Sequence, residues 1–513
     1  MSSRDTERAR WRSEGWYPDK TVAQAIAENV AANPGVRIVF APVEGPERTV
    51  ELAELIDEAR GVAGALYERG IRPGDPVLAQ APTDPEGVVH LLALCLLEAL
   101  TIPLVVTATA PEIALIAAET GAEIAVVAPS WRGVDLLAQM AEAGVPTIIS
   151  TAETLEAKPL PTFESRAPSD DAFIIYTSGS TAAPKGVRHS HETAMCRHPE
   201  ATQGRSTTTL ATFPAGHVAS LLGLIRCVTG NDTTVVTDRW SARHAAELIE
   251  RYQVASSAGT PFFLATLLDE AERTGRDISS MRAFMCGAAA VPPALIDRAQ
   301  AKGIISWRSY GSTEQPLVTS GTAQDPPEKW RSTDGRPAFG AEVRLLDEEG
   351  LEVAQGLEGE IVARGPRQFL GYQNRALDED VFLPGSWFKT GDLGVIDEDG
   401  HLIVTDRIKE IIIRGGENIS AREVENIIAE HPAVLEVGVI AVPDPLFGEG
   451  VGAFVITRGD AILTLEELNA FATERGLVAH KLPSVLELVD DFPRTTSGKI
   501  KKRDLRDQYR ATS

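Results

Sequence analysis

The stretch DAFIIYTSGSTAAPKGVRHSH (residues 171–191) decides the fold, because it joins an apolar run to a loop of small polar residues and then to a helix start. A strand, a small-residue loop and a helix form the setting in which backbone N–H groups converge on an anion. The loop is not a Walker A sequence, because Pro184 takes the place of the glycine that precedes the lysine there. The stretch predicts a phosphate-binding loop, with a solvated polar turn as the alternative.

The segments on both sides of this loop predict an α/β fold. Between about residues 20 and 160, helical patterns such as TVAQAIAENVAAN (21–33) alternate with short β-rich runs such as DPVLAQA (75–81). The alternation resumes over 172–330 and is typical of α/β layers with a largely parallel sheet. The Pro- and charge-rich segment 156–171 is expected to connect two α/β subdomains.

Beyond residue 335 the pattern changes twice. Over 335–405, short alternating runs are separated by EEG and EDG turns, which indicates an antiparallel, barrel-like subdomain. After residue 410, helix and strand patterns fill about a hundred residues, a normal size for a separate domain. We expect a large domain (1–406) of two α/β subdomains and a small β-barrel-like subdomain, followed by a small α/β domain (407–513).

Composition narrows the function classes. A chain of 513 residues is too long for one compact core. The net charge of −24, spread along the chain, argues against nucleic acid or an anionic membrane as the main partner. The charged N-terminus is no signal peptide, and the longest apolar stretch (90–106) predicts a buried helix running into a strand.

Four cysteines without metal-ligand spacing indicate a reduced compartment. We expect a cytoplasmic monomer or homodimer without an integral membrane segment.

Four further motifs follow the phosphate loop: RSYGSTEQP (308–316), WFKTGDLGVIDEDGHLIVTDRIKEIII (387–413), RGGENIS (414–420) and PRTTSGKIKKRDLR (493–506). Together with YTSGSTAAPKG (176–186), they resemble, in the same order, the motifs of the adenylate-forming superfamily of acyl-CoA synthetases, carrier-protein adenylation domains and beetle luciferases. The resemblance spans nearly the whole chain. It implies AMP-forming activation of a carboxylic acid by ATP with Mg²⁺, and CoA as co-substrate.

The resemblance assigns the ATP site to the first two motifs. Tyr310 is expected to offer a flat face to adenine, Thr313 a hydroxyl to phosphate, and Glu314 a hard oxygen to Mg²⁺. Lys185 adds a cation for the phosphates. The loop residues expected to hold the β- and γ-phosphates are Thr177, Ser178, Gly179, Ser180 and Thr181. The residues expected to bring backbone close to the nucleotide are Gly287, Ala288, Ala289, Gly311 and Ser312.

The later motifs supply the ribose and the reacting groups. Asp392 is expected to accept both ribose hydroxyls, with Arg407 nearby, although a surface turn is the alternative for such an aspartate. Lys499 is the leading catalytic candidate, because a cation there would bridge the substrate carboxylate and the α-phosphate as charge builds in the transition state. A generic basic tail is the alternative for Lys499. Since Lys499 belongs to the small domain, the two domains must close for adenylation.

The resemblance also implies that the small domain moves between two half-reactions. Lys409 matches the position of the hinge. The turn formed by Gly415, Gly416 and Glu417 matches the loop that enters the site in the thioester-forming state, and its two glycines permit close backbone approach. Such an exchange of residues is a gating step.

The acyl pocket is the least determined part of the site. His217 matches a position that guards the acyl pocket or pantetheine channel, and a structural hydrogen-bonding role is the alternative. Val218 and Gly259 are expected to line the same pocket, where small apolar residues favour an alicyclic, aromatic or medium-chain acid. His189 and His191 are interpreted as helix-start residues.

One position departs from the family pattern. Ala182 stands in the phosphate loop where the family usually has glycine. If that residue adopts a positive φ, alanine strains the loop by roughly 1 kcal/mol. The leading hypothesis is an acid–CoA ligase. The alternatives are an acyl-AMP ligase that loads a separate carrier protein, a luciferase-like oxygenase, and a nucleotide-binding relative without catalysis.

Overall fold

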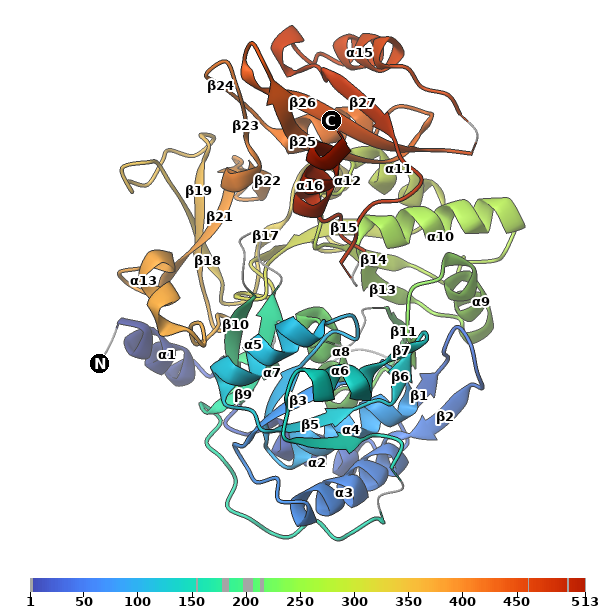
Figure 1. The fold of residues 1–513 in the computed structure, drawn as a ribbon, viewed down its shortest axis with the longest axis vertical. Helices are drawn as coiled ribbons and strands as arrows, with labels where there is room; N and C mark the ends of the chain where they lie inside the picture. The colour runs from blue at the N-terminus through green and yellow to red at the C-terminus, as the bar shows by residue number, and fades with distance from the viewer. Residues whose placement is uncertain are drawn as a thin grey trace.

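The chain folds into a large domain and a small C-terminal domain, as the sequence predicts (Figure 1). The small domain lies at one end of the molecule, next to the strands of the large domain that carry the nucleotide motifs. The structure is a computed structural model, and it describes residues 3–153, 156–177, 184–196, 206–212, 216–459, 461–495 and 498–512.

The two strands that flank the phosphate loop belong to a six-stranded sheet. They form an antiparallel pair in which Thr177 lies opposite Lys185. The remaining neighbours in this sheet are parallel, and helices carry the chain back from β3 to β4, from β4 to β5 and from β5 to β8. The strand order is β10 (Lys185–Ser190), β9 (Asp171–Thr177), β4 (Leu100–Pro103), β3 (Pro76–Gln80), β5 (Ile124–Val127) and β8 (Thr147–Ser150).

A nine-stranded sheet forms the second subdomain. Its central strands are parallel, and its edges are antiparallel. The strand order is β17 (Arg336–Pro337), β16 (Thr319–Ser320), β15 (Ile305–Tyr310), β14 (Ala283–Cys286), β13 (Ser256–Gly259), β11 (Thr208–Ala211), β12 (Thr233–Val236), β1 (Arg37–Phe40) and β2 (Arg48–Glu51). Because β14 and β15 are parallel neighbours, residues 287–289 and 311–314, which are expected to meet the nucleotide, follow them at the same edge of the sheet.

The two sheets are not built from consecutive segments. Strands β1 and β2 come first in the chain but join the nine-stranded sheet through β12. The prediction that segment 156–171 connects two subdomains is wrong, because this segment leads from β8 back into the same sheet, where β9 pairs with β4. The composition of segment 156–171 correctly indicates a loop, but which sheet the next strand joins depends on contacts between residues that are distant in sequence.

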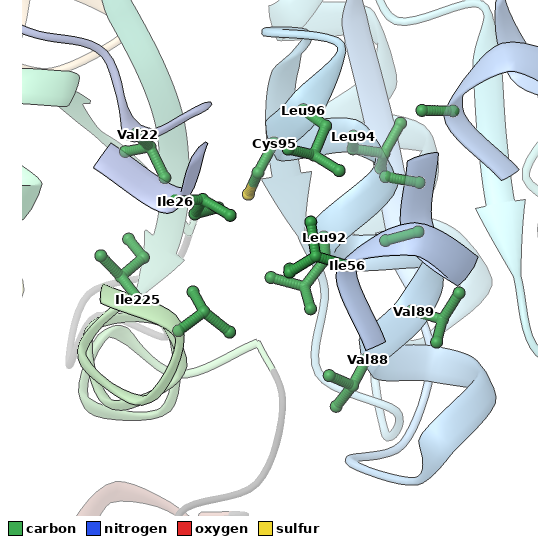
Figure 2. Close-up of a cluster of buried hydrophobic side chains, with 14 of the residues drawn as sticks. Val22, Ile26, Ile56, Val88, Val89, Leu92, Leu94, Cys95, Leu96 and Ile225 are labelled. Atoms are coloured by element: carbon green, nitrogen blue, oxygen red, sulfur yellow. The ribbon is translucent and has the colours of Figure 1, made fainter. Parts of the chain in front are cut away.

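A shared helical layer forms the largest core (Figure 2). Ile26, Ile56, Leu92 and Ile225 come from four different helices, and each is at most 4% exposed. Burying such faces is the main favourable contribution to folding. The helices are α2 (Val22–Ala32), α3 (Leu52–Glu68), α4 (Pro85–Leu96) and α8 (Val218–Thr229). The expected buried helix and strand over 90–106 correspond to α4 and β4.

The segment after residue 335 forms the expected antiparallel subdomain, and the C-terminal segment forms the small domain. The antiparallel strands are β18 (Glu342–Leu346), β19 (Gly359–Arg364), β20 (Phe382–Leu383), β21 (Trp387–Ile396) and β22 (Leu402–Arg407). The small domain contains β23 (Ile412–Arg414), β24 (Glu417–Ile419), β25 (Val434–Asp444), β26 (Gly448–Thr457), β27 (Val485–Leu488), α14 (Ala421–Ile428), α15 (Leu465–Glu474) and α16 (Lys502–Thr512).

The charged N-terminus forms a helix that the sequence analysis did not anticipate. Helix α1 (Ser3–Ser13) lies beside the antiparallel subdomain and α13 (Asp378–Val381) (Figure 1). Its Trp11 is only 1% exposed and packs edge-on against Tyr17. Most of its residues are charged or polar, so the sequence offers little apolar periodicity from which a helix could be predicted.

Within the described part of the chain, no helix is long and apolar enough to cross a membrane.

Candidate active site

A three-residue hydrogen-bonded group joins two subdomains of the large domain. Tyr310 ends β15, whereas Asp392 and Arg407 lie opposite each other on β21 and β22. The Tyr310 hydroxyl donates to Asp392 Oδ2 at 2.6 Å, and Arg407 Nε donates to Asp392 Oδ1 at 2.8 Å. Burial raises the pKa of the Tyr310 phenol, so the hydroxyl keeps its proton as the donor. This group fixes the carboxylate that the family resemblance assigns to the ribose.

The Thr313–Glu314 peptide is held from three sides. His189 Nε2 lies 2.8 Å from the Thr313 carbonyl oxygen, and the Phe369 N–H donates to the Glu314 carbonyl at 2.8 Å. The Tyr372 hydroxyl donates to Glu314 Oε1 at 2.7 Å. Because a carbonyl only accepts, His189 carries its proton on Nε2. The loop that is expected to meet phosphate and Mg²⁺ is therefore held in one position.

Lys185 and Glu314, which are 129 positions apart in the chain, meet at one aromatic ring. Lys185 Nζ lies 5.2 Å from the centroid of the Tyr372 ring, whose hydroxyl holds Glu314. A cation over a tyrosine face is attracted to the ring. Tyr372 thus contacts both Lys185, which is expected to meet phosphate, and Glu314, which is expected to meet Mg²⁺.

Sequence reasoning missed Tyr372 and gave His189 too small a role. His189 is not a helix-start residue: it lies on β10, and α7 (His191–Met195) begins two residues later. The interpretation of His191 as a helix start is confirmed. The sequence signal for Tyr372 is the glycine that precedes it. Gly371 has φ +117°, and a side chain there would clash with Asp378, so the position requires glycine.

The segment after β14, which is expected to bring backbone close to the nucleotide, is tightly packed. A Cβ on Gly287 would lie 2.6 Å from the hydroxyl oxygen of Ser309, so only glycine fits there. Ala288 is exposed and has φ +66°, a region that alanine rarely occupies. Ala289 follows half-buried. Positive φ at a non-glycine residue is a strain that concentrates at functional sites.

The loop after β15 is equally tight. A Cβ on Gly311 would lie 2.5 Å from the Pro316 carbonyl oxygen. The Ser312 N–H donates to the Gln315 carbonyl at 3.0 Å, which closes the turn that carries Thr313. The loop thus presents Thr313 and Glu314 on a short, fixed turn.

Lys499 enters this site from the small domain. Its loop is closed by the Thr495 N–H donating to the Lys499 carbonyl at 2.8 Å, and the adjacent Gly498 has φ +85°. The positive charge of Arg407, together with burial, lowers the pKa of Lys499 to about 8. The carboxylates of Glu410 and Asp392 partly oppose this shift. Lys499 therefore lies within the electrostatic reach of the Asp392–Arg407 pair.

Polar and aromatic contacts dock the two domains in this arrangement. The Arg494 guanidinium lies 4.5 Å from the centroid of the Phe262 ring, and a Cβ on Gly498 would come within 3.3 Å of Phe263. Arg458 pairs with Asp269 at 3.2 Å. The docked face is thus the one that carries Lys499.

The residues expected for the other half-reaction lie away from this contact. Lys409 is exposed in the 3-10 turn Ile408–Glu410. Gly415 and Gly416 join β23 to β24 with φ +61° and +91°, and both are exposed, as is Glu417.

His217 caps α8. Its Nδ1 accepts from the Ala219 N–H at 3.2 Å, and burial, aided by the charge of Lys499, lowers its pKa to about 4. His217 is therefore neutral at neutral pH, close to Lys499. Val218 is 7% exposed and packs in the core cluster of Figure 2, whereas a side chain at Gly259 would clash with Phe263 at 2.8 Å. Both roles of His217, capping and pocket, are compatible with this geometry.

Part of the phosphate loop lies outside the described residues. Thr177 and Lys185 mark its two ends at the tips of β9 and β10. Residues 178–183 have no structural description, and they include the predicted site residues Ser178, Gly179, Ser180 and Thr181 as well as Ala182.

Comparisons with known proteins agree with this architecture. The AMP-binding enzyme family model matches residues 26–373, and the AMP-binding enzyme C-terminal domain model matches residues 423–499. The medium-chain fatty-acid–CoA ligase of Escherichia coli is 29% identical, over 99% of this chain and 93% of the relative. The feruloyl-CoA synthase of Amycolatopsis is 32% identical, over 89% of this chain and 93% of the relative.

Solved structures superpose over nearly the whole chain. ATP-bound MatB from Rhodopseudomonas palustris matches with a TM-score of 0.84 at 27% identity, covering 96% of this chain and all of MatB. The anthranilate–CoA ligase AuaEII with anthranoyl-AMP matches with a TM-score of 0.85 and covers 96% of this chain and 98% of its own. At 22% identity the latter shows the shared fold alone. The chain belongs to the AMP-binding enzyme family of the adenylate-forming superfamily, and it is an AMP-forming acid–thiol ligase.

Proposed function

We propose that this acid–CoA ligase activates an apolar carboxylic acid with the residues described above. The acid's carboxylate oxygen attacks the α-phosphorus of ATP, pyrophosphate leaves, and an acyl-AMP forms. The thiol of CoA then attacks the acyl carbon and AMP leaves. The observation that carries the residue assignment is the approach of Lys499, from the small domain, to the Asp392–Arg407 pair of the large domain.

Lys499 supplies the cation that the first step requires. Two anions meet in this step, so fixed positive charge at the developing transition state lowers the barrier. With a pKa of about 8, Lys499 is mostly protonated at neutral pH. Bound ATP adds negative charge, which favours the protonated form further.

The ribose and triphosphate are held by the large domain. Asp392 retains an acceptor lone pair on each oxygen beyond its bonds to Tyr310 and Arg407, which suits two ribose hydroxyls. Lys185 and the Thr313 hydroxyl are placed on the triphosphate side, where Tyr372 fixes the lysine.

Glu314 fits a role as Mg²⁺ ligand. Tyr372 occupies Glu314 Oε1, and among the described residues no donor binds Oε2, which leaves a hard oxygen for the ion. When bound, Mg²⁺ neutralises phosphate charge. The chain's own contribution is to hold Glu314 at a fixed place beside Thr313.

The acid class follows from the pocket side of the site. Neutral His217, buried Val218 and the Gly259 backbone offer no cation for a second carboxylate among the residues assigned to the pocket. Medium-chain and aromatic acids are substrates named for relatives such as the Escherichia coli and Amycolatopsis enzymes. We infer an apolar monocarboxylic acid of medium-chain, aromatic or alicyclic type.

A coupled assay of AMP release over a panel of acids tests this proposal. The panel contains medium-chain, aromatic and alicyclic monocarboxylic acids and, as controls, dicarboxylic acids of equal length. We expect AMP release that requires both ATP and CoA and a preference for a monocarboxylic acid. Preference for a dicarboxylate would overturn the acid class. Acid-dependent ATP–pyrophosphate exchange without thioester formation on CoA would favour a carrier protein as acceptor.

A further inference from the structure

Four arginines of helix α1 make polar contacts with distant parts of the chain. Arg4 pairs with Asp378 at 3.0 Å, and Arg10 pairs with Glu342 at 2.6 Å. These two fasten the helix to the antiparallel subdomain beside which it lies (Figure 1). Arg8 and Arg12 bind other partners. Arg8 binds Phe369, which contacts Glu314 directly, whereas Arg12 binds Glu192, which is linked to Thr313 through α7 and His189.

A series of hydrogen bonds through α7 and His189 connects Arg12 with Thr313. Both nitrogens Nε and Nη2 of Arg12 donate to the carboxylate of Glu192, at 2.6 and 2.7 Å. The Glu192 side chain is only 6% exposed, and it sits on α7 beside Thr193. Thr193 Oγ1 lies 3.2 Å from His189 Nδ1, and His189 Nε2 donates to the Thr313 carbonyl. The pair therefore fixes the short helix from which His189 is oriented.

Two hydrogen bonds through the backbone of Phe369 connect Arg8 with Glu314. Arg8 Nη2 donates to the Phe369 carbonyl at 3.1 Å, and the Phe369 N–H donates to the Glu314 carbonyl at 2.8 Å. The buried Phe369 ring also packs edge-on against the Tyr372 ring, with centroids 5.0 Å apart. Tyr372 in turn holds the Glu314 carboxylate. Arg8 thus anchors both contacts that fix Glu314.

We propose that Arg8 and Arg12 are positioning residues, through which the N-terminal helix holds the Thr313–Glu314 loop in its ATP-binding geometry. Neither arginine touches the assigned ATP site itself. Their effect passes through Phe369 and Glu192.

The physical reason is the cost of an unpaired buried group. Removing Arg12 leaves the Glu192 carboxylate buried without its guanidinium, so α7 must shift to bring that carboxylate to water. His189 moves with α7, and Thr313 loses its anchor. Removing Arg8 leaves the Phe369 carbonyl without this donor, which loosens the 369–372 segment behind Glu314.

Isothermal calorimetry of Mg·ATP binding, with the full chain, tests the inference, which rests on the proposed assignment of Thr313 and Glu314 to ATP. Arg12→Ala and Arg8→Ala should each weaken Mg·ATP binding by about tenfold, because small displacements of positioning groups carry large costs. Thioester formation from supplied acyl-AMP and CoA should stay within about twofold, since that step does not use the triphosphate side.

Arg10→Ala is the matched control. It removes the pair with Glu342 and two pairs within the N-terminal segment, and Glu342 keeps Arg364 at 2.7 Å. It should lower the melting temperature but leave Mg·ATP affinity unchanged. If Arg12→Ala does not fold, Arg12→Lys keeps one charge, loses the two-point contact and gives the same comparison.

A second comparison isolates the buried charge. Adding Glu192→Gln to Arg12→Ala removes the unpaired carboxylate and should recover part of the Mg·ATP affinity, whereas adding it to Arg8→Ala should not. Equal loss of affinity in the Arg8, Arg10 and Arg12 variants would overturn the inference, because it would show only loss of helix docking. Wild-type affinity in both the Arg8 and Arg12 variants would overturn it as well. Absence of Mg·ATP binding by the wild type would instead overturn the ATP assignment on which it rests.

Discussion

Two glycine-containing loops of the small domain differ in how they meet the rest of the molecule. The loop of Gly498 and Lys499 is pressed against Phe263 of the large domain, and the charge of Arg407 acts on its lysine. The turn of Gly415 and Gly416 is exposed. Both loops contain glycine at positive φ, which permits close approach of their backbone to another part of the molecule, but only the Gly498 loop lies against the large domain.

On our proposal, this difference means that the small domain carries two functional surfaces and engages one at a time. Lys499 is assigned to adenylation on that proposal, and its loop is the one docked on the large domain. On our proposal, rotation about Lys409 replaces the Lys499 loop with the Gly415–Glu417 turn for thioester formation. The docked arrangement is held by the partly exposed pair of Arg458 with Asp269, by Arg494 on Phe262, and by Arg422, which pairs with the buried Asp334 at 3.5 Å. Opening this interface must therefore break both an exposed ion pair and a buried one.

Lys499→Ala should give the largest effect and separate the two surfaces. We expect adenylation, measured as acid-dependent ATP–pyrophosphate exchange, to fall by about 10²- to 10³-fold, as for the loss of one preorganised transition-state contact. Thioester formation from supplied acyl-AMP should fall by less than about tenfold, since Lys499 is withdrawn in that step.

The control for that variant is Lys501→Ala, two residues away. Lys501 is exposed and pairs only weakly with Asp504 at 3.7 Å, so both half-reactions should stay near wild type. Equal losses of the two half-reactions in Lys499→Ala would contradict the separation of the surfaces.

The pH dependence of adenylation should report the same lysine. The protonated form is the active one, and the pKa of Lys499 is about 8 in the docked arrangement without ATP. We therefore expect kcat/KM for ATP to hold below pH 8 and to fall about tenfold for each unit above it, because this ratio reports the free enzyme. The alkaline limb of kcat should lie higher, since bound ATP stabilises the charged amine.

Lys499→Arg provides the check on that profile. A guanidinium stays protonated throughout this range, so the variant should be slower but show no limb near pH 8. A limb that persists unchanged in Lys499→Arg would assign the titration to another group.

The sequence predicted the parts of the site that lie within contiguous motifs. Tyr310, Glu314, Asp392, Arg407 and Lys499 were each identified from a motif, and the expected α/β class and domain order are confirmed. Their roles toward ATP remain predictions. What the sequence did not give depends on distant contacts: strands β1 and β2 join a sheet formed mainly by later residues, and Tyr372 holds a glutamate from another subdomain.

The N-terminal helix shows why such contacts escape sequence analysis. Three of its arginines alternate with Ala9 and Trp11, and the remaining residues are polar or charged, a pattern that fits a solvated tail as well as a helix. Only the positions of Glu192 and Phe369, far along the chain, give Arg8 and Arg12 partners. Partner choice of this kind is fixed by the tertiary fold rather than by local propensity.

The smallest predicted effect concerns the exposed turn. Gly416 has φ +91° and open space around the place of its Cβ, so Gly416→Ala meets no clash and carries only backbone strain, about 1–2 kcal/mol. In the docked arrangement the residues of this turn are exposed, so adenylation should be unchanged. In the thioester-forming arrangement the turn must fit the site, and thioester formation should fall about five- to tenfold.

Gly476→Ala offers a matched control, because Gly476 in the same domain has φ +90° and equally open space. Both variants should lose similar thermal stability, but only Gly416→Ala should slow thioester formation from acyl-AMP and CoA. Equal slowing by the two variants would show that the turn has only a structural role. The Lys499 loop would then be the one functional surface assigned to the small domain.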